Sequence, residues 1–443
     1  MLYPLSHGRI TTWINFHNVI LSIPQTQKFV KGDNVFLLGL TETSHSDTIS
    51  IVSGAEIRKE YEVHYERQNS CYDSRPDSSC PSDSGGNGQR DSGLRRSTFC
   101  CKSVIDDLGQ LFGCNGKTFV IAGTGTLAME MAVSNVTKRG DSILVVSHGY
   151  FGDRFTDICT HKGLDVDVLS SEWGQIVPVE VIRAKLASKH YAAITVTHVD
   201  TATGVCAPIA EIGEMMKEFP DTIYILDGVA ATAGEYANLA EMNIDLMFTA
   251  SQKAFGVCPG LFLLWANQKV LARRAELGMI PEYYVDFDKW IPIMDDPSKY
   301  FATPAINLVW ALKESVRQIK EEGLRARYER HVKNARAMQK ALESLGFRIL
   351  AVPEHRAVTL SNLIYPEGLN DATFRATLLD EGIIVAGGVA SYAGRMFRMG
   401  HMGNIDINDE VTALGVIERA LNRCGVQVAY GTSIGIYMDE MSK

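Results

Sequence analysis

The segment TASQKAFG (249–256) contains a lysine in surroundings that suggest chemistry. Lys253 follows Gln252 and precedes alanine, phenylalanine and glycine, with apolar sequence on both sides. An ammonium ion is costly to bury among apolar groups. Covalent chemistry on the amine gives a reason for a lysine at such a place.

Three other segments carry groups that fit around such a lysine. In AGTGTLAMEMA (122–132), a glycine-rich turn leads into a helix whose backbone N–H groups and hydroxyls could hold a phosphate. Phe151, in HGYFGDR, could stack on a flat ring, and Asp227, in LDGVA, ends an apolar strand where a carboxylate needs a cationic partner. Each alone has an ordinary explanation: a plain strand–helix turn, a core aromatic side chain, and a turn or N-cap aspartate.

Together these four features describe the binding of one kind of cofactor. The lysine can form an imine with an aldehyde, and the aspartate can keep a ring nitrogen protonated. The helix start can hold a phosphate, and the aromatic ring can stack on the cofactor. These are the parts that pyridoxal phosphate needs, and their order along the chain makes the set more specific than any single member.

The elements that must position these residues alternate from about Lys102 onward. Apolar strands are predicted at 117–123, 142–147, 191–200, 223–230, 244–251 and 261–266, and amphipathic helices at 103–113, 126–137 and 209–219. This alternation predicts an α/β fold with a mostly parallel sheet between helices. In open sheets of this kind, ligands bind at the carboxyl ends of the strands, where all four features fall.

The domain organisation follows from shifts in composition. Residues 1–100 form an atypical N-terminal region, and 69–97, rich in Ser, Gly, Asp and Arg, is expected to be disordered. Residues 101–302 form the large cofactor-binding domain. A linking helix and a smaller α+β domain occupy 303–425, and 426–443 is a tail.

Composition excludes several classes of protein. The chain has 443 residues, of which 46% are hydrophobic, and a net charge of -9, which argues against nucleic acid as a partner. No apolar run suggests a membrane span, and the expected location is the cytoplasm. The nine cysteines form no CxxC pair and no His cluster completes a zinc pattern, so free thiols and no metal site are expected.

The chain from about 102 to 422 resembles the class V aminotransferases, which are fold-type-I pyridoxal-phosphate enzymes. It is most similar to their alanine/serine–glyoxylate branch. The segments that carry the resemblance are GTGTLAMEMAV, GYFGDR, HVDTATGV, DGVAATAG, TASQKAFGVCPG, YFATPAINLVWALKES and RMFRMGHMG.

The resemblance implies roles for individual residues. Lys253 would carry the cofactor, Asp227 would contact its pyridine nitrogen, and Phe151 would stack on the ring. The remaining implied positions are Thr124, Gly125, Thr126 and Gln252 at the phosphate, Thr201 near the ring hydroxyl, Tyr300 and Thr303 at the phosphate of the other subunit, and Arg398 at the substrate carboxylate. A homodimer with shared active sites is therefore implied.

The activity implied is transfer of an amino group from a small amino acid, alanine or serine, to a 2-oxo acid, glyoxylate or pyruvate. The cycle should be ping-pong, with Lys253 as the general base. A 2-aminoethylphosphonate–pyruvate aminotransferase would use the same cofactor residues, and Arg398 would serve a phosphonate equally well. A cysteine desulfurase is disfavoured because no cysteine lies between Cys258 and Cys424.

The chain departs from the family pattern in its first hundred residues. The family's N-terminal proline-glycine-proline and histidine/arginine segments are absent, and a Ser/Gly/Arg/Cys-rich stretch stands in their place. A shifted reading frame upstream of about Lys102 and a divergent N-terminal extension both explain this. The loss would leave a catalytically impaired dimeric scaffold as a further alternative. Ala202 and Ala231 stand where the resembling branch often has serine, which weakens the substrate assignment more than the cofactor assignment.

Overall fold

The computed structural model describes residues 101–443 throughout and, before them, the backbone of three strands. These are β1 (Gln27–Lys31), β2 (Asn34–Thr43) and β3 (Ser46–Ser53), which form an antiparallel sheet in that order. The segment 69–97, for which disorder is expected, lies outside the described residues. The chain divides into two units, Met1–Asn87 and Gly88–Lys443.

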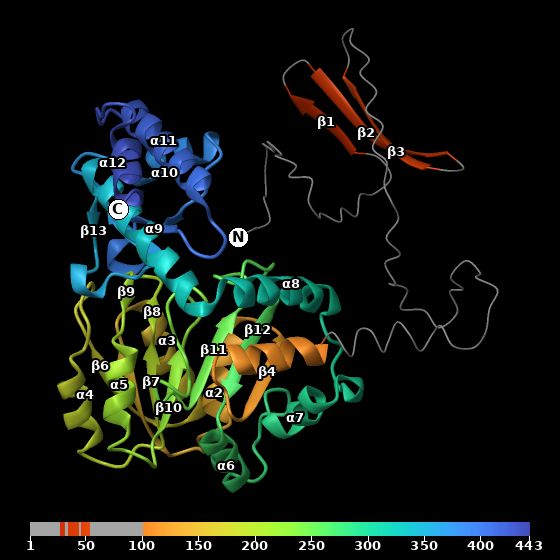
Figure 1. The fold of residues 1–443 in the computed structure, drawn as a ribbon, viewed down its shortest axis with the longest axis vertical. Coiled ribbons are helices and arrows are strands. Elements are labelled where there is room, and N and C mark those ends of the chain that lie inside the picture. Colours follow the sequence, from red (N-terminus) through yellow and green to blue (C-terminus); the bar gives the residue numbers. More distant parts are fainter. Residues whose placement is uncertain (1–26, 32–33, 44–45, 54–100) are drawn as a thin grey trace. The chain divides into compact units, whose positions relative to one another are not determined.

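Within residues 101–443, the largest element is a seven-stranded sheet in the order β4-β12-β11-β10-β7-β5-β6 (Figure 1). Its strands are β4 (Lys117–Ala122), β5 (Ser142–Ser147), β6 (Asp165–Ser170), β7 (Ala193–Thr197), β10 (Ile223–Asp227), β11 (Leu246–Ala250) and β12 (Leu261–Ala266). Strand β12 pairs antiparallel with both β4 and β11, and the remaining neighbours are parallel. All strands except β12 therefore run in one direction, and their carboxyl ends share one edge.

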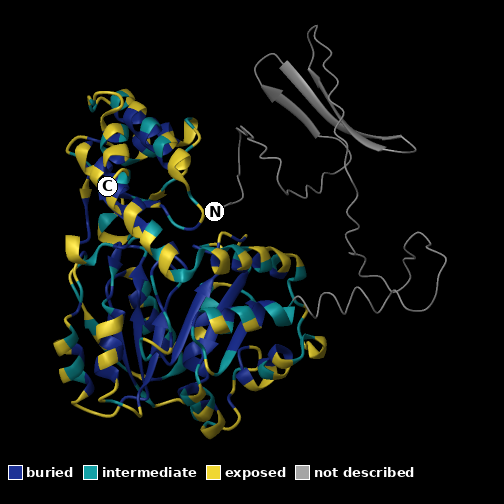
Figure 2. Ribbon diagram, in the orientation of Figure 1, coloured by how far each residue is buried: buried dark blue, intermediate teal, exposed yellow. Residues whose placement is uncertain are grey.

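Helices cover both faces of this sheet because the strands are apolar on both sides, as a parallel sheet requires. One face packs against the helical residues 101–111 and against α4 (Val179–Leu186), α5 (Ile209–Met216) and α8 (Ile306–Glu322). The other face packs against α2 (Gly125–Ser134), α3 (Tyr150–Lys162), α6 (Gln268–Glu276) and α7 (Phe287–Asp295). Figure 2 shows the strands buried between helices whose outer faces are exposed.

A smaller antiparallel sheet follows, in the order β13-β14-β16-β15. Its strands are β13 (Arg348–Ile349), β14 (Leu360–Ile364), β15 (Ala386–Gly387) and β16 (Met396–Gly400). It packs with α9 (Leu324–Ser344), α10 (Asp371–Asp380) and α11 (Ile407–Arg423) in a separate core. The predicted fold class, a mostly parallel sheet with helices plus a smaller α+β part, is confirmed.

The last residues form a helix, α12 (Thr432–Met441), which packs on α9 and α11. Tyr437 is fully buried and donates a hydrogen bond to Glu410. The Ser433 hydroxyl donates to Glu418 at 2.7 Å, and Glu440 pairs with Arg336 at 3.0 Å. The segment named a tail from its sequence is thus part of the C-terminal core.

The strand expected over 191–200 is interrupted in the structure. β7 ends at Thr197, and a short hairpin begins with β8 (Val199–Asp200) and β9 (Val205–Cys206). The N–H of His198 donates to the Asp227 carbonyl at 2.9 Å, and its own carbonyl accepts from Ala207 at 2.7 Å. None of the helices within the described residues combines the length and hydrophobicity that a membrane span requires.

Candidate active site

The predicted cofactor residues follow the carboxyl ends of parallel strands. Thr124 comes after β4, Phe151 after β5, and Thr201 after β7 and the short β8. Asp227 is the last residue of β10, and Lys253 follows β11. Because these strands run in the same direction, the sheet brings residues from five separated segments to one edge.

The predicted phosphate-binding turn lies at the start of α2. Thr124 is the N-cap residue of α2, and its hydroxyl accepts from the N–H of Leu127 at 3.4 Å. Gly125 closely approaches the segment that follows β10, since a Cβ atom there would lie 3.0 Å from the Val229 side chain. The first N–H groups of a helix lack partners inside the helix and point outward, so this turn suits an anion.

Lys253 and Asp227 are close enough to influence each other's charge. Burial lowers the pKa of Lys253, the Arg398 guanidinium lowers it further, and the Asp227 carboxylate acts in the opposite direction. Burial raises the pKa of Asp227 to about 7, while a hydrogen bond from the Val229 N–H, at 2.9 Å, opposes this. The amine of Lys253 makes no hydrogen bond or ion pair with any described residue, and Asp227 makes no ion pair within residues 101–443.

Arg398 lies on β16, in the smaller sheet. Its Nε donates to the carbonyl of Gly387 at 2.8 Å, which fixes the side chain on the neighbouring strand β15. Its charge acts on Lys253, so the smaller sheet contributes to the same site. The guanidinium has no carboxylate partner among the described residues.

Asp200 also belongs to this site, although it was not predicted from the sequence. Its buried carboxylate accepts from the N–H groups of Phe151, at 2.8 Å, Gly152, at 3.1 Å, and Ala202, at 2.8 Å. It thereby fixes the start of α3, where Phe151 lies, against the β8–β9 hairpin. Its charge also acts on Asp227 and Arg398. An aspartate within the HVDTATGV segment was the only sequence signal for it.

Arg154 is the second missed residue. Its Nη1 donates to the hydroxyl of Thr126 at 3.2 Å, and its guanidinium lies 4.8 Å from the centre of the Phe151 ring. It brings a positive charge next to the turn at the start of α2. The GYFGDR segment contains this arginine, but nothing in its spacing points to Thr126.

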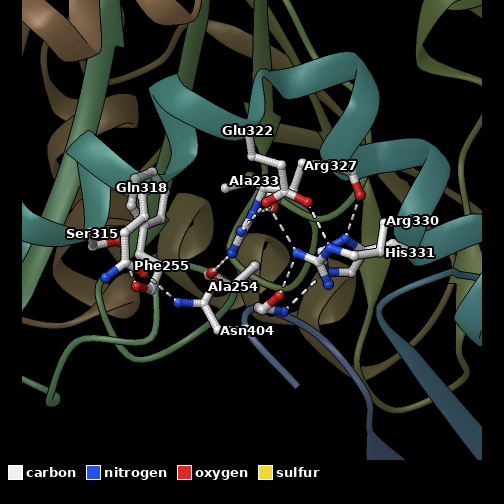
Figure 3. A network of polar contacts seen from close by, with 11 residues as sticks. Ala233, Ala254, Phe255, Ser315, Gln318, Glu322, Arg327, Arg330, His331 and Asn404 are labelled. Atoms are coloured by element: carbon white, nitrogen blue, oxygen red, sulfur yellow. Dashed lines mark hydrogen bonds and ion pairs between the residues drawn. The ribbon is translucent and has the colours of Figure 1, made fainter. Parts of the chain in front are cut away.

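The turn after Lys253 is fastened to α8 and α9 by a polar network (Figure 3). Arg327, which is buried, donates to the carbonyls of Ala254 at 2.9 Å and Ala233 at 2.8 Å, and pairs with Glu322 at 2.7 Å. The hydroxyl of Ser315 donates to the Phe255 carbonyl at 2.6 Å. Hydrogen bonds from α8 and α9 therefore hold the turn that follows Lys253 in place.

The remaining predicted residues differ in how they lie. Thr201 is half-buried at the start of the hairpin turn, and Gln252 is exposed beside Lys253. Tyr300 and Thr303 are exposed, and neither makes a hydrogen bond or ion pair within the described part of the chain.

These residues fit pyridoxal phosphate. The buried carboxylate of Asp227 lacks a cationic partner, which a protonated ring nitrogen would supply. The amine of Lys253 is free of partners and its pKa is lowered by burial, as covalent attachment requires. The start of α2 with Arg154 nearby suits a phosphate, and Phe151 is held in place by Asp200.

Comparison with known proteins is consistent with this site. The family model described as aminotransferase class-V matches residues 96–407. The chain therefore belongs to the class-V aminotransferase family, and this family implies pyridoxal phosphate as the cofactor. The resemblance predicted from the sequence and the assignment as a transaminase are both confirmed.

Individual relatives agree with this assignment. An uncharacterised aminotransferase of Methanocaldococcus jannaschii is 35% identical over 331 residues, 74% of this chain and 85% of the relative. Alanine–glyoxylate aminotransferase 1 of Saccharomyces cerevisiae is 33% identical over 303 residues, 65% of this chain and 78% of the relative. The crystal structure of ureidoglycine–glyoxylate aminotransferase from Bacillus subtilis is similar with a TM-score of 0.75 at 25% identity, covering 78% of this chain and 90% of that chain.

Proposed function

We propose that this protein transfers an amino group from a small amino acid, alanine or serine, to glyoxylate or pyruvate by a ping-pong mechanism. The observation that carries the proposal is the pair formed by the partner-free amine of Lys253 and the buried carboxylate of Asp227 at one sheet edge. Pyridoxal phosphate, when bound, supplies an electron sink for the charge that develops at the α-carbon of an amino acid.

The protein's own residues would divide the remaining work. The amine of Lys253, with its pKa lowered by burial, is suited to take the α-proton from one carbon and return it to another. The carboxylate of Asp227 would stabilise a proton on the ring nitrogen. Thr124, Gly125 and Thr126, with Gln252, would hold the phosphate, and Thr201 would contact the ring hydroxyl.

Arg398 would select the substrate by its carboxylate. A guanidinium forms two parallel hydrogen bonds with a carboxylate, and that geometry is specific to planar anions. Its Nε is already committed to Gly387, so its remaining N–H groups would be used for the substrate. Both substrates carry a carboxylate, so one arginine can serve both halves of the reaction.

Glyoxylate as the acceptor is supported by the names of two relatives. The yeast and Bacillus subtilis proteins are both named as glyoxylate aminotransferases, but their names give different donors, alanine and ureidoglycine. The acceptor is therefore the better supported half of the proposal, and the donor must be measured.

A homodimer with shared active sites is part of the proposal. Tyr300 and Thr303 are exposed, as expected for residues that serve the site of a partner subunit. Hybrid dimers test this directly: mixing Lys253→Ala and Tyr300→Ala proteins should restore activity that each lacks. Failure of mixing to restore activity in confirmed hybrid dimers would contradict a shared site.

The first experiment is the visible absorption spectrum of the purified protein, with Lys253→Ala as the control. We expect a visible band from lysine-bound cofactor that bleaches on adding alanine or serine and returns on adding glyoxylate. The band should be absent from Lys253→Ala. A wild-type protein that stays colourless with added pyridoxal phosphate would contradict the proposal and favour the impaired scaffold, whereas bleaching by 2-aminoethylphosphonate alone would favour the phosphonate enzyme.

A further inference from the structure

We propose that His198, Cys206 and Glu235 bind a divalent cation of zinc-like chemistry. An imidazole nitrogen, the Cys206 Sγ and a carboxylate oxygen of Glu235 lie within 4.8 Å of one another. The three residues come from separate segments, and none belongs to the group predicted to hold the cofactor.

The backbone holds these three side chains in place before any cation binds. His198 is fixed by the two backbone hydrogen bonds that interrupt the strand, one to Asp227 and one from Ala207. Cys206 lies on β9, which pairs with β8 directly after His198. The carboxylate of Glu235 accepts from the N–H of Val358 at 2.7 Å, which orients it. Binding would therefore cost little conformational entropy.

The hydrogen bonding of the cluster is incomplete. The His198 ring is buried, and its Nδ1 has no hydrogen-bond partner among the described residues. The Cys206 thiol lies 3.8 Å from the Ala207 carbonyl and also faces the carboxylate of Glu235.

The donor set selects a particular class of cation. Thiolate and imidazole are preferred by zinc and similar transition metals, whereas magnesium and calcium prefer oxygen ligands alone. One thiolate and one carboxylate together balance a charge of +2, which offsets the desolvation that each would suffer alone. Three protein ligands leave a fourth position for water in a tetrahedral site.

A cation here would join the hairpin that carries Asp200 to the segment that follows Asp227. Both segments contribute to the active site, so the cation would make that side of the active site more rigid. The competing account of the same geometry is a Cys206–Glu235 hydrogen bond without any cation. The two accounts differ in metal content, which is measurable without any assay of transamination.

The test uses the full-length protein saturated with zinc and then dialysed against metal-free buffer. Metal content by mass spectrometry should show about one equivalent more zinc in wild type than in Cys206→Ser. Cys114→Ser is the matched control, because Cys114 is also half-buried with its thiol near carbonyl oxygens. It should keep the wild-type content, and Glu235→Gln should bind zinc about tenfold more weakly or worse.

The X-ray absorption spectrum of zinc in the wild-type protein provides a second measurement that needs no variant. One sulfur with nitrogen and oxygen neighbours supports the proposal, and it decides the matter if Cys206→Ser fails to fold. Wild-type protein that retains no zinc, or retains as much in Cys206→Ser as in Cys114→Ser, would overturn it. A zinc environment without sulfur would overturn it as well.

Discussion

Replacing Arg327 by methionine should destabilise the protein and loosen the turn that carries Lys253. Arg327 is 2% exposed, and its guanidinium donates hydrogen bonds to the carbonyls of Ala254 and Ala233. Methionine fills a similar volume but donates nothing, so both carbonyls would be left without that donor.

The magnitude follows from these contacts. Each buried acceptor left unsatisfied costs about 1–3 kcal/mol, so two give a loss of about 2–6 kcal/mol in the free energy of unfolding. Glu322 adds less, because it keeps Arg330, whose Nε donates to it at 2.6 Å. Partial burial alone would raise the pKa of Glu322, but hydrogen bonds from Arg330 and Arg327 hold it below its ordinary value.

The assay is urea unfolding of wild type, Arg327→Met and the control Arg325→Met, each with and without pyridoxal phosphate. Arg325 lies on the same helix but is exposed, and its ion pair with Glu241 at 2.7 Å should contribute little. Arg327→Met should also release the cofactor more readily, because the turn behind Lys253 is no longer held. A loss below about 1 kcal/mol, or equal losses in the two variants, would refute the reasoning.

Three other predictions follow from the described contacts. Arg398→Gln should lower kcat/KM for the amino donor at least about tenfold, since charge-assisted hydrogen bonds contribute about 1.5–3 kcal/mol each; steady-state kinetics would contradict this if the value were unchanged. Asp200→Asn should lower the pKa of Asp227, because the Asp200 charge raises it, and should weaken the anchoring of Phe151; a pH titration of cofactor absorbance and thermal unfolding measure both effects. Burial raises the pKa of Glu410 to about 7. The neutral form of Glu410 therefore stabilises the folded protein fully below the ordinary carboxyl pKa. About 3 kcal/mol of the free energy of unfolding is lost as the pH rises from there through about 7. Glu410→Gln should abolish that loss, and unfolding at pH 5 and pH 8 would contradict this if the two proteins changed alike.

The sequence by itself determined the fold class, the family and the order of the cofactor residues. Apolar strands and amphipathic helices alternate from about Lys102 onward, and such local periodicity is set by neighbours in the chain. Lys253 was recognisable because a lysine among apolar residues is unusual in any fold. The helix start at Thr124 was recognisable because a glycine-rich turn before a helix is a local signal.

The tertiary structure decided which further side chains join these residues. Asp200 fixes Phe151, Arg154 reaches Thr126, and Arg327 holds the turn after Lys253, and each of these contacts joins segments separated along the chain. The sheet order, in which β4 and β5 are not neighbours, sets these contacts, and no spacing in the sequence encodes that order.

The pKa shifts and the cluster of His198, Cys206 and Glu235 also depended on the tertiary structure. Burial is the largest cause of the shifts at Asp227 and Lys253, and burial is a property of the packed molecule. The spacing of the three residues in the sequence matches no metal-binding motif. They meet because the strand is interrupted at His198 and the hairpin that follows brings back Cys206 on β9. The sequence thus fixes the local elements, whereas contacts between distant elements fix the environment in which their side chains react.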